Sequence, residues 1–364
     1  MNTVIINKSN LLHNYKVIRR LAKQSKVCAV VKANAYGHDM EIVSDVLKDC
    51  VDYFAVSTIE EGMDLRRFGI TNNILILGYI LPDQAKFAID YDLEICIGNE
   101  EQLNSIISIA KAKKKMIKFH LKKNSGLSRY GYNDSKELIV MLDIIERNLK
   151  FLKFVGFFTH FVITENDCEE NIRRQNESFE MDVAVVHGRG FYPLIHAAAS
   201  TTLFLTKKYQ YDMVRVGMAF YGFCGFDEKL KKVLTVKSMV VTTRKISNQQ
   251  TIGYGGDIRP PKNLRVAVVP VGYGYGIPSK LSEKSFVLIN GERCAIIGHM
   301  SMDCMYVDVT ALKDKVVVGS EVVFIGKQKK EEITATDHAH SLGIYSCEIL
   351  THLNIRRFEK KIRG

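Results

Sequence analysis

Several polar residues capable of chemistry stand at the ends of short apolar segments in the first part of the chain. Lys32 directly follows the apolar residues 28–31 (CAVV), where an ammonium group is costly to bury unless it is paired or takes part in a reaction. A desolvated lysine with a lowered pKa is the usual nucleophile toward a carbonyl group, with which it forms a Schiff base. The same position also fits a strand-end lysine whose ammonium group reaches solvent, so the neighbours of Lys32 must decide its role.

Other polar residues at segment ends describe what could surround Lys32. Gly217 and Met218 offer backbone N–H groups where parallel barrels often bind phosphate, and Ser200 suits the same site. Ser200 is also a candidate helix N-cap, and the two roles are compatible. Arginine and histidine side chains follow neighbouring segments, at Arg129, His160, His196 and Arg215. A lysine facing a phosphate site, with arginine and histidine between them, is the set of groups that pyridoxal 5′-phosphate (PLP) needs.

The apolar segments that carry these residues alternate with amphipathic, helix-like ones. The eight segments are residues 27–34, 52–58, 73–79, 93–99, 116–124, 152–161, 193–200 and 213–222. Strands that alternate with helices at this spacing predict βαβ units and a parallel sheet, and eight units predict a (β/α)₈ barrel of the TIM type. Catalytic groups in such a barrel come from the carboxyl ends of the strands, which is where these polar residues stand.

The pattern changes after residue 224. The segments that follow are strand-like and joined by short turns, one of them the hairpin signal Asn290-Gly291. A late helix-like stretch covers residues 347–353. We therefore predict a barrel domain over residues 1–225 and a C-terminal, mainly-β domain over residues 226–364.

Composition restricts the function further. The 364 residues include 51 Lys or Arg and 40 Asp or Glu, for a formal net charge of +11. The basic residues form no localised stripe interleaved with aromatics, so nucleic-acid binding is not expected. The eight cysteines have no metal-ligand spacing, which argues against a disulfide framework and a metal site. With no apolar run of roughly 18 residues and no secretory signal pattern, no membrane association and a cytoplasmic location are expected.

The stretch AVVKANAYGH at residues 29–38 resembles the lysine motif of the fold-type III alanine racemases, which are PLP-dependent. The resemblance continues in chain order over nearly the whole sequence, through residues 126–131, 158–161, 196–200, 214–217, 252–255, 271–273 and 300–303. It implies a barrel followed by a β domain, a homodimer with the active site at its interface, and a role in supplying D-alanine for cell-wall peptidoglycan.

The resemblance also implies roles for individual residues. Lys32 would hold PLP and act as one catalytic base, and Tyr254 from the β domain of the partner subunit would be the other. The remaining assignments are Arg215 at the pyridine nitrogen, Tyr36, Ser200, Gly217 and Met218 at the phosphate, and His160 against the ring face. On the substrate side they are Arg129 and the Met302 backbone at the carboxylate, Asp303 orienting Arg129, Lys122 at the position of a carbamylated lysine, and His196 and Tyr273 as supporting residues.

These roles agree with the chemistry of racemisation. Inverting a carbon centre requires a base on one face and an acid on the other, which Lys32 and Tyr254 would supply. A tyrosine hydroxyl is ordinarily protonated at neutral pH, so it needs a neighbour such as His160 to share its proton. An arginine donates hydrogen bonds and cannot accept them, so Arg215 would keep the pyridine nitrogen unprotonated and favour return of the proton to Cα.

Four positions depart from the commoner family pattern: Asn124, Ala199, Tyr275 and Ile355 replace aspartate or glutamate, asparagine, aspartate and tyrosine, respectively. Many family members have a tyrosine at position 355, which donates to the phosphate and narrows the entrance of the active site. Ile355 would remove both the donor and the narrowing. Asn124 and the residues that follow it, Ser-Gly-x-Ser-Arg, are similar to the motif of racemases that accept a broader range of substrates. Serine and larger amino acids therefore remain alternatives to alanine. A fold-type III decarboxylase is one alternative, but it would need a Gly-rich phosphate loop and a cysteine proton donor, and the sequence has no such glycine run. A non-catalytic PLP-binding barrel is another, but it would lack the β domain that carries Tyr254 and Asp303.

Overall fold

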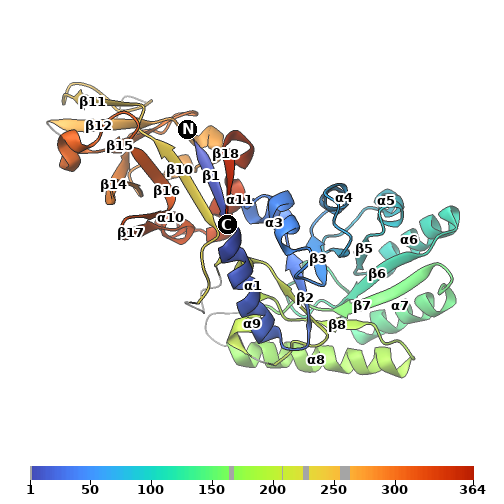
Figure 1. Ribbon diagram of the computed structural model, residues 1–364. Coiled ribbons are helices and arrows are strands. Elements are labelled where there is room, and N and C mark those ends of the chain that lie inside the picture. Colours follow the sequence, from blue (N-terminus) through green and yellow to red (C-terminus); the bar gives the residue numbers. More distant parts are fainter. Residues whose placement is uncertain (1, 164–167, 207, 224–228, 255–262) are drawn as a thin grey trace.

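The computed structural model describes residues 2–163, 168–206, 208–223, 229–254 and 263–364. Within these residues the chain forms two sheets that lie at opposite ends of an elongated molecule (Figure 1). One sheet is parallel and surrounded by helices, and the other is mostly antiparallel and built largely from the last third of the chain. The predicted fold class, a TIM-like barrel followed by a mainly-β domain, is confirmed.

The parallel sheet contains one strand for each of the eight apolar segments. The strands are β2 (Lys26–Val30), β3 (Tyr53–Val56), β4 (Asn73–Ile76), β5 (Glu94–Ile97), β6 (Ile117–Lys122), β7 (Leu152–Phe158), β8 (Leu194–His196) and β9 (Met213–Val216). They are hydrogen-bonded in the order β8-β7-β6-β5-β4-β3-β2-β9. A parallel bridge between Ala199 and Arg215 joins the two ends of this order and closes the barrel.

Helices cover the outside of the strands (Figure 1). They are α1 (Lys8–Ala22), α3 (Met40–Leu47), α4 (Ile59–Arg67), α5 (Ala85–Asp90), α6 (Glu100–Lys113), α7 (Ser135–Arg147), α8 (Cys168–Gly188) and α9 (Ser200–Leu205). The short element α2 (Lys32–Gly37) instead follows the carboxyl end of β2. Local sequence explains their starts: Asp134, for example, accepts hydrogen bonds from the Lys136 and Glu137 amides and so caps α7. The buried residues of α7 are Leu138, Met141, Leu142 and Ile145, the apolar face that its spacing predicts.

The second sheet has ten strands. They are β1 (Thr3–Asn7), β10 (Leu234–Met239), β11 (Thr242–Ile246), β12 (Leu264–Val269), β13 (Phe286–Ile289), β14 (Glu292–Ile297), β15 (Met305–Asp308), β16 (Glu321–Gln328), β17 (Glu331–Ile333) and β18 (Glu359–Arg363). Two helices complete this part, α10 (Ala335–Leu342) and α11 (Ser346–His352). Asn290 and Gly291 have φ values of 56° and 83° and join β13 to β14, so the predicted hairpin turn is confirmed.

Short 3₁₀ helices occupy several connections: η1 (Pro82–Gln84), η2 (Met218–Tyr221), η3 (Tyr273–Tyr275), η4 (Ser279–Leu281), η5 (Thr310–Lys315) and η6 (Ile355–Arg357). The predicted late helix corresponds to α11. Among the described residues, no helix is both long and apolar enough to cross a membrane.

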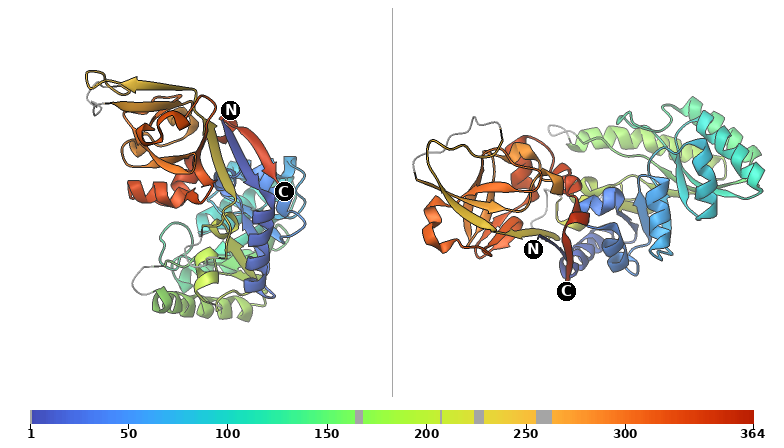
Figure 2. Two further views of the ribbon diagram at one scale, coloured as in Figure 1. Left: turned by 60° about the vertical axis from the view of Figure 1, so that its left-hand side comes forward. Right: turned by 90° about the horizontal axis from the view of Figure 1, so that it is seen from above.

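The first strand belongs to the second sheet, which the sequence pattern did not anticipate. β1 pairs antiparallel with β10 and parallel with β18, so both ends of the chain lie in that sheet (Figure 2). The chain therefore leaves the second sheet before it enters the barrel and returns to it afterwards. A pairing between the two termini cannot be predicted from local periodicity, because the paired segments are more than 350 residues apart.

Candidate active site

A cavity of about 1040 Å³ opens at the carboxyl ends of the barrel strands. Nine of the residues predicted to act in the site line it together: Lys32, Tyr36, Lys122, Arg129, His160, Ser200, Arg215, Gly217 and Met218. Thr334, Thr336 and Ser346 of the second domain also line the cavity. The site therefore lies where a parallel barrel places its chemistry, beside the junction with the second domain.

Lys32 stands at the start of an unusual left-handed turn. The residues that follow it, Ala33 to Tyr36, have φ values of 51–54° and ψ values of 40–52°, a conformation that costs roughly 1–2 kcal/mol for each residue with a side chain. Glu61 of α4 supports the turn, because its carboxylate accepts the Ala33 amide at 2.6 Å and the Ser57 amide at 2.8 Å. Strain of this kind is typical of functional sites.

The left-handed turn also sets the position of α2 against the second domain. Gly37 ends the turn with a φ of +78°, and a Cβ atom at this position would lie only 2.0 Å from the carbonyl oxygen of Leu350 in α11. A residue with a side chain would therefore push the two elements apart. The turn thus carries Lys32 and Tyr36 into the cavity while its end packs against the β domain.

Tyr36, Ser200 and Gly217 form a small polar pocket suited to a phosphate group. Ser200 Oγ accepts a hydrogen bond from the Gly217 amide at 3.1 Å. A Cβ atom at position 217 would lie 2.7 Å from the hydroxyl oxygen of Tyr36, so only glycine leaves this space open. Burial raises the pKa of Tyr36 to about 12, which keeps its hydroxyl protonated and able to donate. Ser200 does not cap α9, because Ala199 occupies the N-cap position, so that part of the prediction is wrong.

The cavity is lined by four cationic side chains, Lys32, Lys122, Arg129 and Arg215, and by Lys232, whose ammonium group lies over the Phe223 ring. Burial lowers the pKa of Lys32, and the charge of Arg129 lowers it further. Burial also lowers the pKa of Lys122 to about 8, with the other three cations acting in the same direction. Among the described residues, no aspartate or glutamate lines the cavity. The electrostatics therefore favour a ligand with several negative charges.

His160 is held neutral in these surroundings. Burial lowers its pKa to about 3, and the charges of Arg215, Arg129, Lys122 and Lys32 act in the same direction. Its Nδ1 atom lies 3.4 Å from Nη2 of Arg215. A neutral imidazole at this place has one nitrogen that accepts a hydrogen bond and one that donates.

Arg215 is buried at the end of a hydrogen-bonded chain that crosses the barrel interior. Its Nη1 contacts Nδ1 of His196 at 2.7 Å, Nε2 of His196 contacts Nδ1 of His120 at 2.8 Å, and Nε2 of His120 contacts Glu94 at 2.7 Å. A guanidinium can only donate and a carboxylate only accept. Both histidines must therefore be neutral with the proton on Nε2. Each donor in the chain then gives its hydrogen bond to the next member on the way from Arg215 to Glu94.

Burial lowers the pKa of Arg215 to about 10, so the guanidinium stays charged at neutral pH. Its Nη2 also donates to the carbonyl oxygens of Thr159 and Ala197, which fixes the plane of the group. Sequence reasoning identified His196 and missed His120 and Glu94. The available signal was a histidine and a glutamate inside two consecutive apolar segments, where unpaired polar groups are costly.

The predicted residues of the second domain lie away from this cavity within one chain. Tyr254 lines a separate hollow of about 560 Å³ beside Ser301, Cys304 and Tyr306, and its side chain is 71% exposed. Met302 and Tyr273 are also largely exposed. Asp303 accepts a hydrogen bond from Arg357 at 3.1 Å, so a single chain gives it a partner other than Arg129.

The four departures from the family pattern have different surroundings. Asn124 Oδ1 accepts the Gly126 and Ser128 amides and so shapes the loop that carries Arg129. Ala199 lines the cavity. Tyr275 packs against Phe358 with ring centroids 5.1 Å apart, and Ile355 is buried. The last two therefore contribute to packing in the second domain.

The arrangement fits PLP on structural grounds. An amine of lowered pKa, an open space at Gly217 beside two hydroxyl groups, and a buried arginine donor surround one cavity whose described lining carries no negative charge. These are the groups that an aldehyde cofactor with a phosphate and a pyridine ring requires.

Comparisons with known proteins agree with this architecture and site. A family model described as alanine racemase, N-terminal domain, matches residues 6–224, and one described as alanine racemase, C-terminal domain, matches residues 233–361. The alanine racemase of Methylacidiphilum infernorum is 34% identical over 361 residues, covering 97% of this chain and 91% of its own. That of Symbiobacterium thermophilum is 33% identical over 350 residues, covering 94% and 92%.

Solved structures are similar over the same length. The alanine racemase of Bacillus anthracis with bound L-Ala-P has a TM-score of 0.93 at 27% identity, covering all of this chain and 95% of that one. The alanine racemase of Clostridium difficile 630 has a TM-score of 0.90 at 28% identity, with 99% and 95% covered.

Proposed function

The chain belongs to the alanine racemase family and is a racemase, and we propose that it interconverts L-alanine and D-alanine with PLP held by Lys32. The observation that carries this proposal is the cavity in which Lys32, Arg215 and the pocket of Tyr36, Ser200 and Gly217 face one another. Bound PLP supplies an electron-withdrawing group that makes the α proton of an amino acid acidic enough to remove.

Lys32 has two roles in the proposal. Its amine holds the cofactor, and it then takes or returns the α proton on one face of the substrate. Burial and the charge of Arg129 lower the pKa of Lys32, so the neutral amine that each role requires is less costly to form. The strained turn after Lys32 supports this function, because it holds the backbone of the lysine in one place.

Tyr254 serves the opposite face of the substrate, and it does so from a partner subunit in a homodimer. Its hydroxyl lies on the exposed face of the second domain rather than in the cavity of its own chain. A proton must be exchanged on both faces of Cα, and the family resemblance assigns the second face to Tyr254 of the partner subunit. His160, neutral and inside the cavity, is suited to share the tyrosine proton.

Arg129 binds the substrate carboxylate, together with the backbone of Met302 from the partner subunit. Arg129 is exposed at the edge of the cavity, where a guanidinium can pair with a carboxylate through two hydrogen bonds. Lys122 lies close enough to lower the pKa of its neighbours and has a pKa of about 8. The neutral form of its amine can add CO₂ and release a proton to give a carbamate, whose negative charge would offset the positive charge of Arg129.

Arg215 sets the electronic character of the ring. It would donate to the pyridine nitrogen of bound PLP and supply no proton, because a guanidinium that already donates to His196, Thr159 and Ala197 stays charged. The ring then withdraws electrons less strongly than a protonated pyridine. Return of the proton to Cα is favoured over its transfer to the cofactor, so the product is the other enantiomer rather than a keto acid.

A chiral assay of the purified enzyme tests the function. Alanine, serine, lysine and arginine are each supplied as a single enantiomer with PLP, and the opposite enantiomer is separated and quantified. Alanine should be among the best substrates, and its D form would serve peptidoglycan synthesis in the cytoplasm. If serine or a larger amino acid reacts and alanine does not, the alanine assignment fails while the cofactor assignment survives.

Serine is the second candidate substrate, because Asn124 is similar to the residue found in racemases of broader substrate acceptance, and its side chain shapes the loop that carries Arg129. A pocket discriminates a single methylene by only about 1–3 kcal/mol. The ratio of kcat/KM for alanine to that for serine is therefore the quantity to measure.

A further inference from the structure

We propose that Asp182 is a positioning residue for Arg129, acting through both ends of the loop that carries it. The loop spans residues 123–134, between β6 and α7, and Asp182 lies in α8 on the outer side of the barrel. The inference rests on the proposed role of Arg129 at the substrate carboxylate. It assigns a function to a buried cluster that does not line the cavity.

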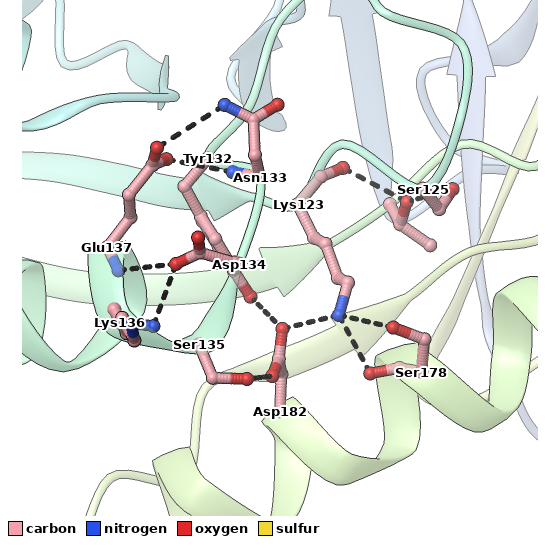
Figure 3. Close-up of polar contacts among 11 residues, drawn as sticks. Lys123, Ser125, Tyr132, Asn133, Asp134, Ser135, Lys136, Glu137, Ser178 and Asp182 are labelled. Atoms are coloured by element: carbon pink, nitrogen blue, oxygen red, sulfur yellow. Dashed lines mark hydrogen bonds and ion pairs between the residues drawn. The ribbon is translucent and has the colours of Figure 1, made fainter.

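Three side chains at the two ends of the loop donate to this one carboxylate (Figure 3). Lys123 Nζ contacts Asp182 Oδ2 at 2.6 Å, the Tyr132 hydroxyl donates to the same oxygen at 2.8 Å, and Ser135 Oγ donates to Oδ1 at 2.9 Å. The Tyr132 and Asp182 side chains are almost fully buried. Hydrogen bonds to a buried charge are stronger than those between neutral groups.

Lys123 is anchored to α8 by more than the ion pair. Its ammonium group also donates to the carbonyl oxygen and to the hydroxyl of Ser178, both at 2.8 Å (Figure 3). All three donors of the ammonium group therefore have acceptors, as a buried lysine requires. The first residue of the loop is fixed to the helix, and Asp182 fixes the far end to the same helix.

The backbone closes the loop at the same place. The Asn124 amide donates to the Tyr132 carbonyl at 2.9 Å, and the Tyr132 amide donates to the Lys122 carbonyl at 3.1 Å. Gly131, at a φ of +118°, allows this approach, because a Cβ there would lie 2.6 Å from the Asn124 nitrogen. Arg129 thus sits near the tip of a loop whose two ends are joined to each other and to α8.

The strand itself links the cluster to the cavity. Lys122 and Lys123 are consecutive, and side chains of consecutive strand residues point to opposite faces. Lys122 lines the cavity and Lys123 reaches α8. Asp182 therefore affects the site through the position of the strand end and the loop, while its own charge is neutralised by Lys123 on the opposite side of the sheet.

The test uses the PLP-loaded full-length enzyme and the variant Tyr132→Phe, which removes one donor at the loop end and keeps the Lys123–Asp182 pair. We expect KM for alanine to rise about three- to tenfold, with kcat within about twofold, because a displaced Arg129 weakens binding of the carboxylate in ground state and transition state alike. The inhibition constant of propionate, a carboxylate without the amino group, should rise by the same factor. The matched control Tyr211→Phe also removes a tyrosine hydroxyl that is bonded to α8, at Asn176 and Glu180 and away from the loop, and should change neither constant by more than about twofold.

A double mutant separates positioning from general destabilisation. In an Arg129→Ala background, Tyr132→Phe should cause no further rise in KM, because the group it positions is gone. Amide hydrogen exchange of residues 124–131 should be faster in Tyr132→Phe than in Tyr211→Phe. The inference is overturned if Tyr132→Phe leaves KM unchanged, or if the effects of Tyr132→Phe and Arg129→Ala multiply. A wild-type enzyme that racemises no amino acid would instead overturn the proposed function.

Discussion

At the scale of single residues, Lys32 carries the largest functional consequence. The variant Lys32→Ala should lose the visible absorption of the PLP-loaded protein and all measurable racemisation, because no other amine is held at the start of the left-handed turn. The matched control is Lys232→Ala. Lys232 also lines the cavity and has a pKa lowered by burial, but it stacks on Phe223. Spectra recorded from 300 to 500 nm decide the assignment, and loss of the band in both variants would contradict it.

Lys122 makes a prediction about stability and pH. Its pKa is about 8 in the folded protein and near 10.4 in an unfolded chain. Between these values the unfolded chain holds more protons, so this residue makes stability rise with pH through that window. Below pH 8 Lys122 is charged in the folded protein, and burying this charge lowers the free energy of unfolding by its full amount. Lys122→Met should therefore stabilise the cofactor-free protein at pH 7 by about 1–3 kcal/mol.

Urea denaturation of both proteins at pH 7 and at pH 10 measures the effect. The difference between Lys122→Met and the wild type should shrink at the higher pH, because the wild-type lysine is then mostly neutral when folded. Lysines distant from position 122 titrate equally in both proteins and cancel in the difference. A gap that stays constant with pH would show that packing, rather than charge, separates the two proteins.

At the scale of elements, the left-handed turn of α2 stores strain that a substitution can release. Ala33 is exposed and has φ 51° and ψ 52°, a conformation that glycine adopts without steric cost. Ala33→Gly should therefore stabilise the protein by about 0.5–1 kcal/mol. The control Ala112→Gly, at an exposed position of the right-handed helix α6, should destabilise it by about the same amount. Equal signs for the two changes in the free energy of unfolding would refute the assigned conformation.

The interior chain from Glu94 to Arg215 is also a property of elements. Its members come from β5, β6, β8 and β9, which bring four side chains into line because parallel strands keep a fixed register. Residues 196 and 215 were identified from their places at segment ends. Glu94 begins β5 and His120 lies within β6, so neither stands at the carboxyl end of its strand, where chemistry is expected. The partner of each appears only when the strands are side by side.

At the scale of the whole molecule, the distribution of the two proposed bases predicts complementation between subunits. Lys32→Ala and Tyr254→Phe proteins should each be nearly inactive alone. When they are mixed and allowed to exchange subunits, half of the dimers become heterodimers with one intact site, so about a quarter of the wild-type activity should appear. The measurement is racemisation before and after exchange. No recovery, despite heterodimers verified by mass spectrometry, would place both bases in one chain.

The amino-acid sequence by itself determined the two architectures and nine of the residues that line the cavity. Periodicity predicts strands and helices because the side-chain repeat of each is local. Strand-end residues such as Lys32, His196 and Arg215 follow from the rule that parallel barrels place their chemistry at the carboxyl ends. The family motifs then assigned Tyr36 to the phosphate site, and its hydroxyl is close to Gly217 in the structure.

Only the tertiary structure decided which distant groups meet. No local pattern connects the segments that meet in the contact of Glu61 with the turn after Lys32, in the Glu94 to Arg215 chain and in the pairing of β1 with β18. The same holds for the contacts of Asp182 with both ends of the Arg129 loop. Register between strands and the packing of helices on them are set by burial over the whole core, so the partners of a buried polar group are fixed only after the chain has folded around it.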